Sequence, residues 1–169
     1  MKFVAVLVVG FFNSVAFAGQ FPSQILGTYD VLENTECSHQ GHDYDPRECR
    51  ISSDDGFYSA SLELFQFTTE AGETVTSFVE ALPYAHDQVN LQDFDATDTT
   101  GLRCFGKVEY LSLKGFKYVE GCSRPDRLNR TSTYEVSLDA QGGSYSNLIE
   151  GIDSRGPYKY LRRFKIARH

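Results

Sequence analysis

The stretch at residues 102–122, LRCFGKVEYLSLKGFKYVEGC, decides the fold expected for this chain. Its first half alternates in steps of two between apolar or small residues and a second set that is charged except for Phe105, which indicates a strand with one buried face. A five-residue link with a glycine, 111–115, turns the chain back, so the second half is predicted to pair with the first as a hairpin. Pairing Cys104 with Cys122 then sets the register.

This register is consistent on both faces of the hairpin. It places Val108 opposite Tyr118, Tyr110 opposite Phe116, Glu109 opposite Lys117 and Phe105 opposite Gly121. Apolar side chains thus meet on one face and opposite charges on the other, as cross-strand energetics favour. Glu120 is the misfit, because it falls on the apolar face opposite Gly106.

The same alternation predicts about eight strands in total, and no amphipathic helix stands out. They are residues 25–33, 60–68, 75–82, 102–110, 116–122, 132–138, 144–152 and 158–166. Short links with turn residues between the later strands favour antiparallel neighbours. Two long connections, 34–59 and 83–101, are the places where function is expected.

The fold class expected is therefore all-β. An antiparallel meander with one solvent-exposed face must bury its other face. Closing into an up-and-down barrel buries that face and also removes the unpaired edges. A barrel of about eight strands can hold side chains or one small ligand inside. A two-sheet β-sandwich is the alternative.

The start of the chain reads as a cleavable signal peptide, residues 1–18, followed by one domain, 19–169. Lys2 precedes an apolar run, and Ala16 and Ala18 supply the small side chains that signal peptidase requires. The run is shorter than the roughly 18 to 20 apolar residues of a membrane anchor, so no transmembrane segment is expected. The protein should be secreted or periplasmic.

The four cysteines support that location. An even number in an exported chain suggests disulfides, and the spacing of Cys37, Cys49, Cys104 and Cys122 is too wide for a usual zinc site. Three pairings are possible. The hairpin register favours Cys104 with Cys122, which leaves Cys37 with Cys49.

Metal binding has only weak candidates, and no cofactor is expected. One group lies inside the 37–49 loop and consists of His39, His42, Asp43 and Asp45, which a solvated loop explains equally well. A second group, Asp93, Asp95 and Asp98, begins like a calcium loop but lacks the later glycine and glutamate in the required places.

The net charge of −7 makes nucleic acid an unfavourable partner. The C-terminal stretch is basic and reads as a solvated strand face; its basic residues are Lys159, Arg162, Arg163, Lys165 and Arg168. Asn129-Arg130-Thr131 is a glycosylation sequon, which has meaning only in a eukaryotic source.

Gly27-Thr28-Tyr29 on the first strand and Arg162 on the last provide a resemblance to a known group. The layout is similar to that of the lipocalins and the wider calycin group of small-ligand-binding barrels, which carry Gly-x-Trp and an arginine at these places. The resemblance implies that Gly27, Tyr29 and Arg162 close the barrel and that a ligand binds elsewhere inside it.

The aromatic content fits this implication, since 13 Phe and 10 Tyr can line a cavity or fill a core. The candidate lining residues are Tyr110, Phe116, Tyr118, Tyr134 and Tyr145. We expect a non-catalytic binding protein for a small apolar or amphipathic molecule, and a cavity of roughly 300 Å³ or more would favour it.

Two alternatives come from other classes of function. One is a secreted interaction module, an inhibitor or envelope component, that acts through the long loops on a partner still to be identified. The other is a loop-based hydrolase using a histidine such as His39, His42 or His86, although no Gly-x-Ser-x-Gly motif marks a nucleophile.

Overall fold

The computed structural model describes residues 21–41, 46–53, 56, 59–124, 128–140 and 142–169. Within these residues the chain forms ten strands and two short 3-10 helices, η1 (Ser23–Ile25) and η2 (Pro46–Cys49). The strands are β1 (Gly27–Gln40), β2 (Ser61–Thr68), β3 (Thr74–Leu82), β4 (Ala85–Asn90), β5 (Phe94–Thr97), β6 (Arg103–Ser112), β7 (Gly115–Arg124), β8 (Leu128–Asp139), β9 (Gly142–Asp153) and β10 (Gly156–Arg168). No helix among these residues is long and apolar enough to cross a membrane.

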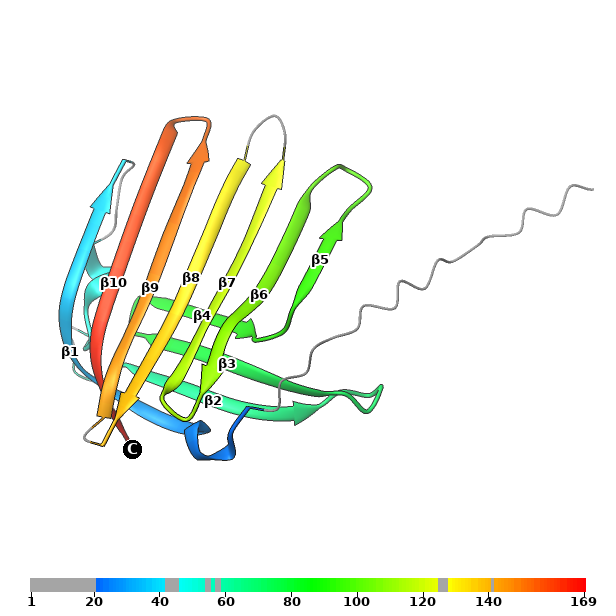
Figure 1. Cartoon of the computed structure of the whole chain (residues 1–169). Coiled ribbons are helices and arrows are strands. Elements are labelled where there is room, and N and C mark those ends of the chain that lie inside the picture. Colours follow the sequence, from blue (N-terminus) through cyan, green and yellow to red (C-terminus); the bar gives the residue numbers. More distant parts are fainter. Residues whose placement is uncertain (1–20, 42–45, 54–55, 57–58, 125–127, 141) are drawn as a thin grey trace, which may run out of the picture.

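All ten strands belong to one antiparallel sheet in the order β4-β3-β2-β1-β10-β9-β8-β7-β6-β5. The sheet curls through 250° into an open half-barrel, with β2, β3 and β4 crossing the lower ends of the long strands (Figure 1). The prediction of an all-β antiparallel meander is confirmed. The closed barrel of about eight strands is wrong, and a single continuous sheet replaces the two-sheet alternative.

The sheet does not close into a barrel, and both of its unpaired edges come from the second long connection. Residues 83–101 were expected to be a loop, but they contain β4 and β5, which are the two edges of the sheet. These strands follow each other in the chain and do not pair with each other. Both are short and mostly polar or exposed, as edge strands usually are, and this is why alternation did not reveal them.

The β6–β7 hairpin confirms most of the predicted register. Cys104 faces Cys122, Phe105 faces Gly121, Gly106 faces Glu120 and Val108 faces Tyr118. A bulge between Val108 and Tyr110 then shifts the remaining pairs by one residue, so Leu111 takes the place opposite Phe116. Tyr110 is therefore 38% exposed instead of facing the core. The ion pair of Glu109 with Lys117 still forms, at 2.8 Å.

The bulge also shortens the turn, since Ser112 pairs with Gly115 and only two residues remain between the strands. Gly115 has a φ of 120°, and a side chain there would collide with the Val136 carbonyl oxygen. A glycine is thus required at this position by both backbone conformation and close approach.

Both predicted disulfides are present. Cys104–Cys122 joins β6 to β7 with its Cα atoms 4.1 Å apart, and Cys37–Cys49 joins the end of β1 to η2 with its Cα atoms 6.2 Å apart. The first bridge reinforces a hairpin of the sheet. The second holds part of the 34–59 connection against the long strands.

The lower part of the half-barrel is filled by aromatic side chains. Phe78 on β3 lies among the rings of Phe116, Tyr134 and Tyr145 from the opposite wall, at centroid distances of 5.6, 6.2 and 5.3 Å. The apolar void beside them measures only about 10 Å³. Four of the five candidate lining residues, Phe116, Tyr118, Tyr134 and Tyr145, are thus part of a packed core.

Candidate binding site on the concave face

Two adjacent rows of side chains cross the concave face of the long strands at the upper border of the aromatic core. Ladder partners place Tyr118, Tyr134, Asn147 and Arg162 in the lower row. The upper row, one inward position further along each strand, contains Glu120, Ser132, Ile149 and Tyr160. Because inward positions recur every second residue, the alternation of the strands fixes both rows.

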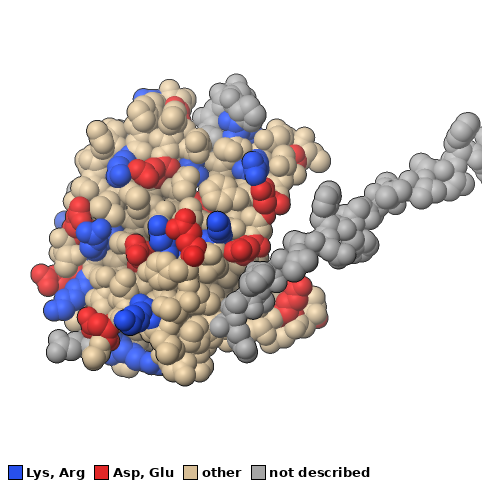
Figure 2. Space-filling view, in the orientation of Figure 1, with Lys and Arg blue, Asp and Glu red and all other residues tan. Residues whose placement is uncertain are grey.

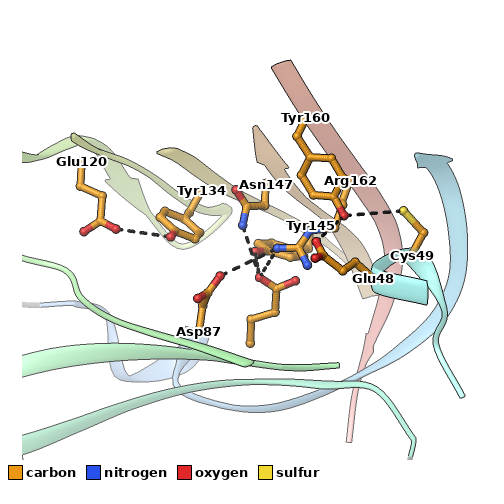
Figure 3. Close-up of polar contacts among 10 residues, drawn as sticks. Glu48, Cys49, Asp87, Glu120, Tyr134, Tyr145, Asn147, Tyr160 and Arg162 are labelled. Carbon is orange, nitrogen blue, oxygen red and sulfur yellow. Dashed lines mark hydrogen bonds and ion pairs between the residues drawn. The ribbon is translucent and has the colours of Figure 1, made fainter. Parts of the chain in front are cut away.

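Glu80 on β3 faces the lower row from across the half-barrel and collects three hydrogen bonds on one oxygen (Figure 3). Its Oε2 accepts from Arg162 Nη2 at 3.0 Å, from Tyr145 OH at 2.9 Å and from Asn147 Nδ2 at 3.4 Å. Asp87 on β4, directly opposite Glu80 in the ladder, has Oδ2 3.9 Å from Arg162 Nη2. We call these five residues the interior polar cluster.

Four of the five residues of the interior polar cluster are deeply buried, with Glu80, Asn147 and Tyr145 at 0% exposure and Arg162 at 2%, whereas the Asp87 side chain is partly exposed. Four atoms of the cluster nevertheless lack a hydrogen-bond partner among the residues that the structure describes. They are Glu80 Oε1, Asn147 Oδ1, Arg162 Nε and Arg162 Nη1. Buried polar atoms in native proteins are almost always paired, so the cluster retains hydrogen-bonding capacity for water or for a polar ligand group.

The upper row carries its own polar contacts. Tyr134 OH donates to Glu120 Oε1 at 3.3 Å, and Tyr160 OH donates to Glu48 Oε2 on η2 at 2.9 Å. The Arg162 guanidinium lies 5.4 Å from the centroid of the Tyr160 ring. The Cys37–Cys49 bridge thus brings η2 to the upper row.

Burial sets the protonation behaviour of these carboxyls. It raises the pKa of Glu80, against the opposing effects of Arg162 and the Tyr145 hydrogen bond. It also raises the pKa of Glu120, where the Tyr134 hydrogen bond and Arg130 act in the opposite direction and the negative charge of Asp87 adds to the increase. Burial raises the pKa of Tyr118 and Tyr134 as well.

A pH dependence of stability follows from Glu120. Its pKa in the folded protein exceeds its ordinary value of 4.5, so the native state binds more protons than the unfolded state between the two values. The contribution is fully present below the unfolded pKa and is lost as the pH rises through the folded pKa. We expect Glu120→Gln to weaken the dependence of the free energy of unfolding on pH in this range. Urea unfolding at a series of pH values measures it.

Asp95 provides a control of opposite sign, because the Arg103 hydrogen bond lowers its pKa. Its contribution is present above the unfolded pKa and is lost as the pH falls through the folded pKa. Asp95→Asn should therefore change the pH dependence of the free energy of unfolding only at acidic pH. If Glu120→Gln left the slope of the free energy of unfolding against pH unchanged, the pH dependence would not come from Glu120.

The expected barrel closure by Tyr29 and Arg162 is not the arrangement found. In the β1–β10 ladder Tyr29 lies opposite Arg168, whereas Arg162 lies opposite Cys37. Tyr29 OH donates to the Ile25 carbonyl at 2.6 Å, and Arg168 donates to the carbonyls of Gln24 and Leu26. Arg168 thus holds the lower end near Gly27, and Arg162 belongs to the interior polar cluster.

The carboxylates of the second weak metal group are separated by their partners. Asp93 accepts from the Val108 amide, Asp95 pairs with Arg103 at 2.6 Å, and Asp98 accepts from the backbone of its own turn. In the first weak group, His39 lies in β1, while His42, Asp43 and Asp45 fall outside the described residues. Among described residues no group of three potential ligands could hold a metal ion.

The described histidines are all exposed. His39 lies on β1, opposite Tyr160 of the upper row in the ladder. His86 is exposed on β4. His169, 74% exposed, has Nδ1 3.2 Å from Asp30 Oδ2 at the surface.

The basic stretch near the C-terminus is largely neutralised. Lys159 pairs with Glu150 at 2.8 Å and Arg163 with Glu36 at 2.7 Å, both on the outer face. Figure 2 shows positive and negative side chains interspersed over this face. Asn129 of the sequon is exposed at the start of β8.

Sequence reasoning missed Glu80, Asp87 and Asn147. A signal for Glu80 was available, because it continues the inward row of Phe78 and Leu82 within a predicted strand. A charged residue in a row of core positions requires a buried partner. Asp87 could not be found in this way, since its strand was read as a loop.

The chain matches no protein-family model, and no curated protein matches it in sequence. The functional argument therefore depends on the concave face itself.

Proposed function

We propose that this is a non-catalytic binding protein of a secreted or periplasmic space that holds a small amphipathic molecule on the concave face of the half-barrel. The observation that carries the proposal is the set of unpartnered, buried polar atoms in the interior polar cluster. A ligand group with hydrogen-bonding capacity, directly or through water, would satisfy them. The two disulfides agree with an oxidising compartment.

The apolar part of the ligand contacts side chains of the upper row. Ile149 lies between Ser132 and Tyr160 in the ladder, and both Ile149 and Tyr160 are only partly buried. The aromatic core below is filled, so the ligand contacts this row instead of entering the core. A polar end directed to the cluster and an apolar end against Ile149 describe an amphipathic molecule.

A test uses the neutral apolar dye N-phenyl-1-naphthylamine, whose emission rises when it leaves water. We expect saturable binding at one site per chain, weakened about tenfold by Ile149→Ala because apolar contact area is lost. Leu148→Ala is the matched control, since Leu148 precedes Ile149 in β9 and strand alternation places it on the opposite face of the sheet. Native mass spectrometry of protein from its own source should show a co-purifying small molecule.

A second function, the interaction module, is favoured by the filled core and by the way the 34–59 connection is held. Asn34 Nδ2 donates to the Cys49 carbonyl at 2.9 Å, and the Arg47 guanidinium lies 5.5 Å from the Tyr84 ring centroid on the β3–β4 turn. A connection fixed at several points can present a constant surface. Absence of both saturable dye binding and a co-purifying molecule would contradict ligand binding and support this function.

A further inference from the structure

The charges on the concave face are unequal. The described carboxylates with contacts to the two rows or to the interior polar cluster are Glu48, Glu80, Asp87 and Glu120. The described guanidinium groups that act on them are those of Arg130 and Arg162. A ligand that brings positive charge to this face is therefore favoured by electrostatics.

Arg162 does not reverse this conclusion. Its Nη2 is shared between Glu80 at 3.0 Å and Asp87 at 3.9 Å, so its charge is already balanced. An anion that approached Nε or Nη1 would come close to both of these carboxylates. The two free donors of Arg162 suit a neutral acceptor such as water.

Asp87 and Glu120 lie on either side of Tyr134 (Figure 3), whose hydroxyl donates to Glu120 Oε1 at 3.3 Å. In agreement with this placement, both carboxylates raise the pKa of Tyr134, and Asp87 adds to the raised pKa of Glu120. The Asp87 side chain is 42% exposed, which gives this region contact with solvent. Arg130, itself exposed, is the described cation that acts on Glu120.

Buried acceptors provide an independent indication of a ligand. Asn147 is fully buried, and its Oδ1 has no partner among described residues. Its Nδ2 donates to Glu80, and Figure 3 shows its oxygen on the side of Tyr134. An acceptor and a tyrosine ring are groups that bind an ammonium through hydrogen bonding and cation–π contact.

We infer that the polar end of the ligand is a cation, an amine or quaternary ammonium, held by Asp87 and Glu120 against the ring of Tyr134. This inference depends on the proposed binding function and specifies its ligand class. It also gives a reason for placing two like charges near each other on a partly buried surface, because a bound cation would offset their repulsion.

The experiment compares three amphiphiles of equal chain length, decyltrimethylammonium, decanol and decanoate, by titration calorimetry below their aggregation concentrations. We expect the cation to bind at least about tenfold more tightly than decanol, and decanoate to bind most weakly. Added salt should weaken the cation alone. Equal or tighter binding of decanoate would overturn the inference.

The variant Asp87→Asn/Glu120→Gln removes both charges while keeping side-chain size. Its affinity for decyltrimethylammonium should fall about tenfold more than its affinity for decanol, and cooperative urea unfolding should show that the variant is folded. Glu150→Gln, the same loss of charge on the outer face, should match the wild type, and Asp87→Asn alone is the fallback if the double variant does not fold. Unchanged cation affinity in a folded variant overturns the inference, whereas failure of all three amphiphiles to bind overturns the proposed function itself.

Discussion

Arg162→Met is expected to lower the free energy of unfolding by about 3–5 kcal/mol, because it leaves a buried carboxylate without its cation. Glu80 is fully buried and has Arg162 as its ion-pair partner at 3.0 Å. Tyr145 and Asn147 still donate to Glu80 after the substitution, but neither carries charge. Denaturation in guanidinium chloride, evaluated by linear extrapolation, measures the loss.

Arg163→Met is the matched control, since the adjacent arginine points outward and pairs with Glu36 at the exposed surface. It should cost no more than about 1 kcal/mol. The double variant Arg162→Met/Glu80→Leu should recover most of the stability that Arg162→Met loses, because it removes both buried charges together. A loss below about 1 kcal/mol in Arg162→Met would contradict the described pairing.

Phe78→Ala is expected to cost about 3–5 kcal/mol, through lost burial and the cavity that remains. Phe78 on β3 is the ring through which the crossing strands contact the opposite wall, where it meets Phe116, Tyr134 and Tyr145. Its surroundings are already close-packed and come from several strands, so they cannot easily collapse into the space.

Phe67→Ala makes the same chemical change on β2 at a ring that is 38% exposed, and it should cost less than about 1 kcal/mol. Thermal and denaturant unfolding of both variants, with near-ultraviolet circular dichroism of the tyrosines, distinguishes the two sites. Similar losses in Phe78→Ala and Phe67→Ala would show that the core is not centred on Phe78.

Much of this fold could be predicted because its strands have one buried and one wet face, a pattern that the sequence states directly. The stretch from Arg103 to Val108 shows this, since its partners across the hairpin were correct up to the bulge. The bulge itself could not be predicted, because Glu109 reaches Lys117 in either register and so gives no preference. Ladder shifts of this kind are decided by neighbouring strands.

The edge strands and the interior polar cluster were harder to predict from the sequence than the rest of the fold. β4 and β5 each have one neighbour only, so their sequences are under weaker pressure to alternate. Asn147 and Arg162 are partners in the β9–β10 hairpin, but Glu80 reaches them from β3, 67 and 82 residues earlier in the chain, and no local spacing connects it to them. The resemblance singled out Arg162 but placed it over Tyr29, whereas the ladder assigns Arg168 to that end.

The strand order has a consequence for how the chain can fold. Every pairing between named strands joins neighbours in sequence, except that of β1 with β10. The sheet therefore consists of two contiguous arcs, β1–β4 and β5–β10, each of which can form by successive hairpin closure at small entropic cost. Only the β1–β10 seam requires closure of a loop that spans most of the chain, so its formation should be the slow, committing step that turns two independent ribbons into one cooperative unit.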